Sequence, residues 1–371
     1  MRSSKLNRTN PNIFSSADLP LPTLPFDVIS EILARLPVKS LLQFRCVSKS
    51  WKSLISDPVF VKKHLYLSTT RRLLCVSYNP SFRFILNSYS LQSVFPDTNY
   101  SITRFQFPFG VISKRYSHYI VGSCDGILCV ANYRFPPDFK HVVVLWNPSI
   151  RKFKELPPFE NPTDLDRRII TYGLGYDHVS HDYKLLVLYN SFLKGVIAKV
   201  YTLKADSWRT IKRFPSDFGR LADYGRGIYV SGTINWMIRQ CWIVSFDLVT
   251  ESYQKILPPR QQTEPKYLGL SVLRDWLCII SYNDVWVMKE YGILDSWTKL
   301  FNVTHLLDPP SSFFRLTNVL YIFQDDQVLL VFKNPWDRVL LIVYDFKNDT
   351  SKVSFLLKDI SEVYVESLIS P

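Results

Sequence analysis

The alternation of apolar and polar positions along the chain changes its period near residue 67. Before that point, apolar residues recur every three or four positions, as on one face of an α-helix. The first such stripe consists of Val28, Ile29, Ile32, Leu33 and Leu36. Pro25 fits a first helical turn, and Pro37 ends this helix because proline breaks the hydrogen-bond ladder. Ser48 and the pair Asp57-Pro58 are predicted to begin two further helices, so this segment forms a small helical unit.

Beyond residue 67 the pattern predicts strands, because apolar residues alternate with polar ones or form short runs between turns. One hairpin recurs five times, with an apolar strand, a polar turn and a second strand. We expect one pair of large side chains to face each other across each hairpin. The expected pairs are Trp146 with Phe153, Tyr201 with Trp208, Phe246 with Tyr253, Met288 with Trp297, and Tyr344 with Val353. The first three pairs are seven residues apart and the last two are nine apart.

A second hairpin precedes each of these, and its turn residues recur at steps of about 45–50 residues. The turns are Asp125-Gly126, His181-Asp182, Gly232-Thr233, Arg274-Asp275 and Asp325-Asp326, with Asn79-Pro80 as an earlier one. Two hairpins per repeat give four strands, which is the pattern of a β-propeller blade. The fold is therefore predicted to be a small all-α unit followed by an all-β propeller of about six four-stranded blades. A seventh blade is left open. The strand-like segment 363–369 is expected to pair with the first blade and close the ring.

Three regions follow from this pattern: a disordered tail over residues 1–22, the helical unit over 23–66 and the propeller over 67–371. A unit of roughly 42 residues is hard to stabilise alone. We therefore expect the helical unit to dock on the propeller or on a partner.

The composition is that of a globular protein, with 47% hydrophobic and 21% charged residues among 371. No apolar run is long enough to span a membrane, so no membrane partner is expected. The six cysteines form no regular framework, which favours buried thiols in a cytoplasmic or nuclear setting. The net charge is +13, but no basic stripe interleaves with aromatic residues, so nucleic-acid binding is disfavoured. A mildly basic face is also compatible with an acidic partner.

Candidate chemistry is sparse along the chain. Asp177, His178, His181 and Asp182 have the residue types of a metal site, but they fall in a predicted tight turn, where such residues are common. No catalytic residue, cofactor or metal is therefore assigned. The nine tryptophans are expected to be mostly structural. Trp336 is the exception because it lies in a polar turn outside the repeat, and it is our one expected contact with a partner.

The helical unit resembles the F-box motif in its plant form. The matching elements are Leu24-Pro25, Ile29, Glu31-Ile32-Leu33, Arg35 to Leu41, Phe44 to Val47, Lys49-Ser50-Trp51, Leu54-Ile55, Asp57-Pro58 and Phe60. The resemblance implies that this unit binds the Skp-type adaptor of a cullin–RING (SCF) ubiquitin ligase. The residues expected to bind the adaptor, or to support that surface, are Leu24, Pro25, Ile29, Ile32, Leu33, Leu36, Pro37, Leu41, Val47 and Trp51.

The strand region resembles the plant F-box-associated, kelch-like domain, most closely that of the S-locus F-box-like group. The matching segments are Gly122 to Leu128, Trp146 to Ser149, Gly173 to Asp177, Asp182 to Lys184, Tyr201 to Trp208, Gly232 to Trp236, and Val285 to Gly292 with Ser296 to Lys299. Such domains act as substrate receptors, so the resemblance implies a non-catalytic subunit that brings a protein substrate to the ligase. Its recognition surface is expected in the longest non-repeat stretches, 96–117, 158–170, 190–197, 215–227, 258–266 and 302–317.

Two other functions remain open at this stage. One is an F-box scaffold that binds the adaptor without any part in ubiquitination. The other is a propeller lectin or enzyme with a helical cap, which requires converging polar or metal-binding groups at the central channel.

Overall fold

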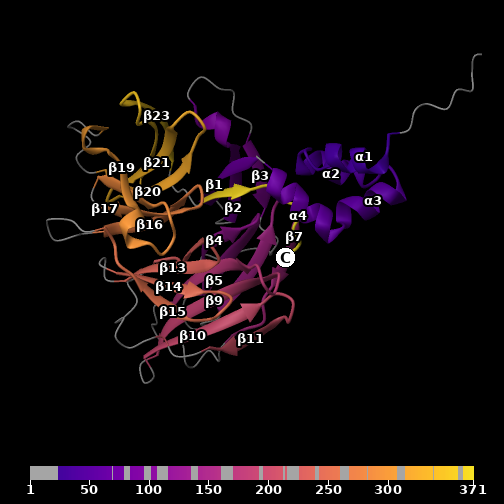
Figure 1. Cartoon of the computed structure of the whole chain (residues 1–371), viewed down its shortest axis with the longest axis horizontal. Helices are drawn as coiled ribbons and strands as arrows, with labels where there is room; N and C mark the ends of the chain where they lie inside the picture. Colours follow the sequence, from indigo (N-terminus) through magenta and orange to yellow (C-terminus); the bar gives the residue numbers. More distant parts are fainter. Residues whose placement is uncertain are drawn as a thin grey trace, which may run out of the picture.

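The computed structural model is a helical unit docked on one face of a ring of β-sheets (Figure 1). The structure describes residues 24–68, 70–78, 84–95, 102–106, 116–134, 141–159, 170–191, 195–211, 214, 225–238, 242–259, 267–281, 283–306, 314–336, 338–357 and 362–371. The expected tail over residues 1–22 lies outside this set.

Four helices form the helical unit: α1 (Phe26–Leu33), α2 (Val38–Phe44), α3 (Lys49–Ser56) and α4 (Pro58–Leu67). The predicted helix starts are confirmed. The side chain of Ser48 accepts a hydrogen bond from the backbone N–H of Trp51, and Asp57 accepts from those of Val59 and Phe60. Their apolar faces meet in one cluster that includes Leu33, Val38, Leu41, Ile55 and Phe60. The helices therefore have a core of their own, although it is a small one.

Six four-stranded sheets make the ring, as predicted. The sheet that we call blade 1 holds β24 (Glu362–Val365), β1 (Arg71–Tyr78), β2 (Phe84–Ser90) and β3 (Ile102–Gln106). Blade 2 holds β4 (Tyr116–Cys124), β5 (Ile127–Arg134), β6 (His141–Asn147) and β7 (Lys152–Glu155). Blade 3 holds β8 (Ile170–Asp177), β9 (Asp182–Ser191), β10 (Gly195–Thr202) and β11 (Ser207–Thr210).

The other three sheets repeat this order. Blade 4 holds β12 (Ile228–Val230), β13 (Thr233–Ile238), β14 (Trp242–Asp247) and β15 (Tyr253–Ile256). Blade 5 holds β16 (Tyr267–Leu273), β17 (Trp276–Ser281), β18 (Asp284–Met288) and β19 (Trp297–Asn302). Blade 6 holds β20 (Arg315–Ile322), β21 (Gln327–Lys333), β22 (Val339–Asp345) and β23 (Thr350–Leu357). Short 3-10 helices lie at η1 (Leu91–Val94), η4 (Leu294–Ser296) and η5 (Thr304–Leu306).

The core of the ring lies between the blades. Each of the six spaces between neighbouring blades is filled by an apolar cluster of described residues from both blades. Between blades 1 and 2, for example, Leu74 and Leu86 pack with Val130 and Trp146. The middle strands are covered on both faces. Their sequences are therefore continuous apolar runs and do not alternate between apolar and polar residues.

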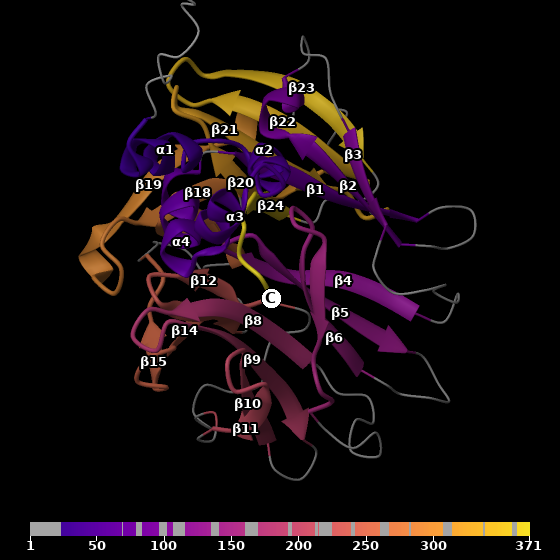
Figure 2. The same ribbon diagram turned by 90° about the vertical axis from the view of Figure 1, so that its right-hand side faces the viewer.

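Closure of the ring by its C-terminal strand is confirmed. β24 pairs antiparallel with β1, with Arg72 opposite Tyr364 and Leu73 opposite Val363. The strand ends at Val365, earlier than the sequence predicted. Residues 366–371, which we call the C-terminal tail, continue toward the helical unit, and Leu368 of this tail joins the core of that unit. Figure 2 shows the helices in front of the ring and the tail running to the C-terminus beside them.

The predicted strand registers are confirmed in four hairpins and wrong in one. Trp146 pairs with Phe153, Tyr201 with Trp208, Phe246 with Tyr253 and Met288 with Trp297. Tyr344 pairs with Ser351 instead of Val353, so this hairpin has the seven-residue spacing of the first three. Val353 faces Ile342 across a bulge and its side chain is exposed. The prediction assumed an apolar partner for Tyr344. It failed because the register is fixed by the length of the turn and not by hydrophobicity.

One of the six predicted blade turns also needs correction. β1 and β2 are the second and third strands from the ring centre in their sheet, because β24 supplies the first. The connection at Asn79-Pro80 is therefore not equivalent to the Asp125-Gly126 turn, which joins the first two strands of blade 2. Residues 79–83 themselves lie outside the described residues.

Candidate functional site

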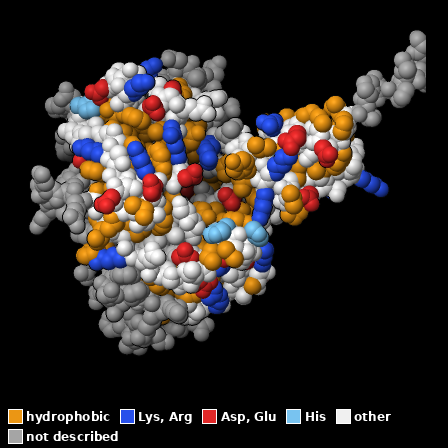
Figure 3. All heavy atoms as spheres, viewed as in Figure 1, with side chains coloured by type: hydrophobic (Ala, Val, Ile, Leu, Met, Phe, Trp, Pro, Cys, Tyr) orange, Lys and Arg blue, Asp and Glu red, His pale blue; other side chains and the backbone are white. Residues whose placement is uncertain are grey.

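The helical unit exposes apolar side chains that its own core does not use. Large parts of Leu24, Phe26, Val28, Ile32 and Val47 are open to solvent, and we call this set the outer helical surface. Val28 and Ile32 are one turn apart on α1, so their side chains share a face. Figure 3 shows hydrophobic side chains gathered at the end of the helical unit that points away from the sheets. Exposed apolar groups concentrated on one small unit indicate a surface for another protein.

The residues expected to bind an adaptor divide into three groups. Leu24, Pro25, Ile32, Pro37 and Val47 are exposed; Ile29, Leu36 and Trp51 are half-buried; Leu33 and Leu41 are buried in the helical core. In this structure the last two support the surface from below. Phe26 and Val28 are exposed beside the predicted residues and were not in the predicted set. The helical period alone could have separated the outward positions 28 and 32 from the inward positions 29, 33 and 36.

One helix fixes the unit on the ring. The ammonium of Lys62 in α4 donates a hydrogen bond to the hydroxyl of Tyr176 in β8, with 2.7 Å between Nζ and the oxygen. Val61 and Leu65 of the same helix pack against an apolar cluster shared by blades 2 and 3. The tail residue Ile369 belongs to that cluster. The orientation of the outer helical surface relative to the ring is therefore set by α4 and the C-terminal tail.

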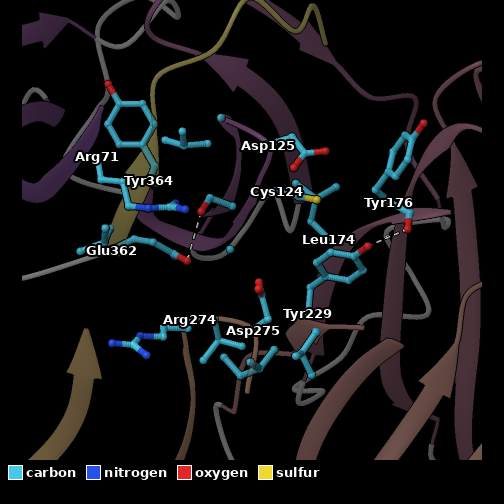
Figure 4. A pocket seen from close by; sticks show the side chains of 18 of the residues that line it. Arg71, Cys124, Asp125, Leu174, Tyr176, Tyr229, Arg274, Asp275, Glu362 and Tyr364 are labelled. Atoms are coloured by element: carbon cyan, nitrogen blue, oxygen red, sulfur yellow. Dashed lines mark hydrogen bonds between the residues drawn. The ribbon is translucent and has the colours of Figure 1, made fainter. Parts of the chain in front are cut away.

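A cavity of about 1100 Å³ occupies the centre of the ring, where the first strands of the blades meet (Figure 4). Lys62, Leu65 and Tyr66 of α4 line it together with the turns Asp125-Gly126 and Arg274-Asp275. The helical unit thus lies on the face that carries the turns between the first and second strands of the blades.

Several of the charged groups that line this cavity have partners. Arg226 and Glu362 form an ion pair with 2.7 Å between Nη1 and Oε2, and the hydroxyl of Ser123 also donates to Glu362. Burial raises the pKa of Glu362, although Arg226 opposes this effect. Asp125 accepts a hydrogen bond of 2.9 Å from the hydroxyl of Tyr183. Each pair joins two different blades, so these contacts hold the ring together.

The cavity also contains a thiol, that of Cys124. Burial raises the pKa of this thiol well above its usual range, which keeps it protonated and a poor nucleophile. Cys75, Cys129 and Cys278 are likewise buried, as expected, whereas Cys46 is exposed and Cys241 lies outside the described residues.

The carboxylates considered as metal ligands have other partners. Asp177 forms an ion pair of 2.8 Å with Lys184 and accepts hydrogen bonds from the backbone N–H groups of Val179 and Ser180. Burial alone would raise the pKa of Asp177, but the hydrogen bonds from Lys184 and Ser180 outweigh it and lower the pKa. Asp182 accepts from the backbone N–H of Lys204. In the part of the chain that the structure describes, no group of His, Cys, Asp and Glu is arranged to hold a metal ion.

The strand ends that lead from one blade to the next lie on the other face of the ring. The connections from the fourth strand of one blade to the first strand of the next fall within 107–115, 156–169, 211–227, 257–266, 303–314 and 358–361. They leave the sheets at the ends opposite to the turns that face α4, because the four strands of each blade run antiparallel. Most of the stretches expected to recognise a partner are of this kind, and large parts of them lie outside the described residues.

The described tryptophans range from buried to exposed, and Trp242 is exposed as well as Trp336. Trp146 and Trp236 are buried between blades, and Trp208 and Trp297 are half-buried in strands. Trp336 lies in the turn between β21 and β22 and has 67% of its surface exposed. That turn joins the second and third strands of blade 6, so it lies on the face from which the connections between blades start. None of the described helices is long and apolar enough to cross a membrane.

Two family descriptions match the chain. The F-box domain matches residues 21–63, and the F-box associated beta propeller domain matches residues 76–371. The F-box/kelch-repeat protein At3g23880 of Arabidopsis thaliana is 30% identical to this chain, and the match covers 99% of both. The F-box protein CPR1 of Arabidopsis thaliana is 29% identical, and the match covers 94% of this chain and 87% of that protein.

Proposed function

The chain belongs to the F-box proteins that carry an F-box associated beta propeller domain, and from this premise we propose that it is the substrate-recognition subunit of an SCF ubiquitin ligase. The F-box would bind a Skp-type adaptor, and the propeller would bind a protein substrate. The subunit would have no catalytic role. We place this activity in the cytoplasm or the nucleus, where cullin–RING ligases work.

One observation carries the proposal. The outer helical surface leaves apolar side chains exposed on the side turned away from the ring. The helical unit is small, and these side chains add nothing to its core. Burying one such side chain contributes roughly 1.5–3 kcal/mol, and association costs offset part of the sum. An apolar partner surface is therefore needed to cover Phe26, Val28 and Ile32.

The arrangement of the two parts supports a mechanism by proximity. α4 and the C-terminal tail fix the F-box on one face of the ring, while the connections from blade to blade start from the other. A substrate held by the ring would thus be kept in a defined position relative to the adaptor. Raising the effective concentration of substrate lysines near the ubiquitin-loaded enzyme is what such a subunit contributes.

The test is a pull-down of the full chain with a purified Skp-type adaptor. Ile32→Asp combined with Val47→Asp places charges on two exposed positions of the outer helical surface, and we expect adaptor binding to be lost while the fold is retained. Val353→Asp is the matched control, because this exposed valine lies on the outer strand of blade 6. Leu33→Asp is unsuitable, because Leu33 is buried and its loss would unfold the F-box.

The outcomes separate the remaining alternatives. Failure of the wild-type chain to bind any Skp-type adaptor would refute the proposal. Adaptor binding without cullin-dependent ubiquitin transfer to proteins held by the ring would instead favour a scaffold role.

A further inference from the structure

The turn between β21 and β22 is built to hold Trp336 in the open. The buried side chain of Asn334 accepts hydrogen bonds through Oδ1 from the backbone N–H groups of Trp336 and Arg338, at 3.1 and 2.9 Å. The backbone N–H of Asn334 donates to the carbonyl oxygen of Arg338 at 3.1 Å. These three bonds restrain the turn, so a large ring is presented to solvent at low cost in conformational entropy.

Three cationic residues lie at the same edge of blade 6 as this turn. Arg315 is the register partner of Lys333, and Lys333 is the partner of Val339, which directly follows Arg338. All three cationic side chains are exposed. Asp337, within this turn, lies outside the described residues. We call Arg315, Lys333, Trp336 and Arg338 the Trp336 corner.

We propose that the Trp336 corner is a docking site for an acidic, partly apolar segment of the protein substrate. This inference rests on the proposed function, because it names the chemistry that the ring recognises. Exposed tryptophan and arginine are the residues that most often carry binding energy at interfaces. The cations would steer a negatively charged segment toward the corner and fix its register, while the indole provides an apolar anchor.

The corner suits a peptide better than a nucleic acid. Nucleic-acid binding relies on many phosphate contacts along a basic stripe. Here three cationic residues and one indole share one edge of one blade. An acidic peptide with one aromatic or aliphatic side chain matches such a compact site.

The site also lies where a substrate can reach it. The β21–β22 turn is at the edge of blade 6 opposite to the β20–β21 turn, which lines the cavity beside α4 through Gln324. A segment bound at the Trp336 corner would therefore leave the F-box and its outer helical surface accessible to the adaptor.

The test selects short random peptides, displayed on phage, against the full chain. We expect the enriched peptides to be rich in Asp and Glu with an aromatic or aliphatic residue among them. The most enriched peptide and its charge-inverted counterpart, with Lys in place of each acid, are then labelled and their affinities measured by fluorescence anisotropy. Trp336→Ala should weaken binding of the acidic peptide by at least about tenfold. Lys333→Glu with Arg338→Glu should weaken it similarly and reduce its dependence on salt.

The matched control is Lys347→Glu with Lys352→Glu. It makes the same change of charge in the same blade, near the turn between β22 and β23, and should leave the affinity unchanged. Peptides without acidic enrichment, equal binding of the charge-inverted peptide, or full binding by Trp336→Ala would each overturn the inference. So would a labelled single-stranded oligonucleotide that binds more tightly than the peptide and depends on the same cations. Because no adaptor is present, a failure here is distinct from a failure of the adaptor pull-down.

Discussion

The side-chain amide of Asn147 donates a hydrogen bond to the backbone carbonyl oxygen of Ile369 at 2.8 Å, although the two residues are 222 positions apart in the chain. The same amide nitrogen lies 3.1 Å from the carbonyl oxygen of Ser367. Asn147 is fully buried at the end of β6. One side chain of blade 2 therefore anchors the C-terminal tail that also reaches the core of the F-box.

Replacing this amide should loosen the tail. Asn147→Ala leaves two buried carbonyl groups without their donor, and we expect a loss of about 1–3 kcal/mol in the free energy of unfolding. Urea denaturation measures the loss, and limited proteolysis should show earlier cleavage near residues 366–371. Gln254→Ala, at an exposed position of β15, is the control and should change the stability by less than about 0.5 kcal/mol. An unchanged midpoint for Asn147→Ala would show that the tail is held by its apolar contacts alone.

Alanine substitutions at two glycines distinguish the cost of backbone strain from the cost of steric crowding. Gly126 and Gly292 both have a φ of +85°, so alanine at either position costs about 1–2 kcal/mol from the backbone. A Cβ atom at Gly126 would also lie 2.6 Å from the carbonyl oxygen of Val365 and against Ser367, whereas at Gly292 it would meet nothing within 4 Å. We expect Gly126→Ala to lower the thermal midpoint much more than Gly292→Ala. Equal effects would mean that the tail moves aside freely.

The buried lysine of blade 3 gives a prediction about ion pairs. Lys184 contacts Asp177 at 2.8 Å and Glu251 at 3.2 Å, and the side chains of Lys184 and Asp177 are almost completely buried. Lys184→Met leaves a buried carboxylate without its partner and should cost about 3–5 kcal/mol. Lys299→Met is the matched control, because its pair with Asp284 is more exposed and should contribute about 0–1 kcal/mol. Similar losses in the two variants would contradict this assignment.

The stability of the F-box should depend on pH through His64. Burial lowers the pKa of this buried imidazole, while the hydrogen bond of 2.9 Å between Nε2 and the carbonyl oxygen of Leu36 opposes the shift. The unfolded chain takes up the proton near pH 6.5, above the folded pKa. The contribution of His64 is therefore complete above about pH 6.5 and is lost as the pH falls toward the folded pKa.

Denaturation of the full chain from about pH 5 to 8 tests this dependence. His64→Gln removes the titrating group and should flatten the loss of stability on acidification, whereas His178→Gln, at an exposed turn, should leave it unchanged. A wild-type slope that survives His64→Gln would assign the dependence to other groups.

Local sequence patterns predicted the architecture because each blade repeats the same order of apolar strands and polar turns. Four hairpin registers could be read from paired residues such as Trp146 and Phe153, since a turn of fixed length sets the pairing. The fifth failed at Tyr344, where an exposed valine was taken for an inward one. The six blades and their closure followed from the repeat length and from one alternating segment near the end of the chain.

The outer helical surface was less predictable from the sequence, because it depends on contacts between segments that are far apart in the chain. The α1 stripe identified an apolar helix, but only the packing of Leu33 against Ile55 and Phe60 shows which positions remain outside. Nothing local indicates that Leu368 belongs to the core of a unit that ends some 300 residues earlier. Trp336 could be singled out only because it broke the repeat.

The closure of blade 1 by β24 and the insertion of Leu368 into the F-box core have a consequence for biosynthesis. Residues 362–369 leave the ribosome after β1–β23. The F-box is synthesised first, but its core is complete only when these residues have been added. Until then blade 1 has an open edge, which exposes it to chaperones and proteases. A premature stop codon after β23 would leave five blades whole but the ring open. Such an allele is expected to behave as a null through quality control, and not as a partial receptor competing for the adaptor.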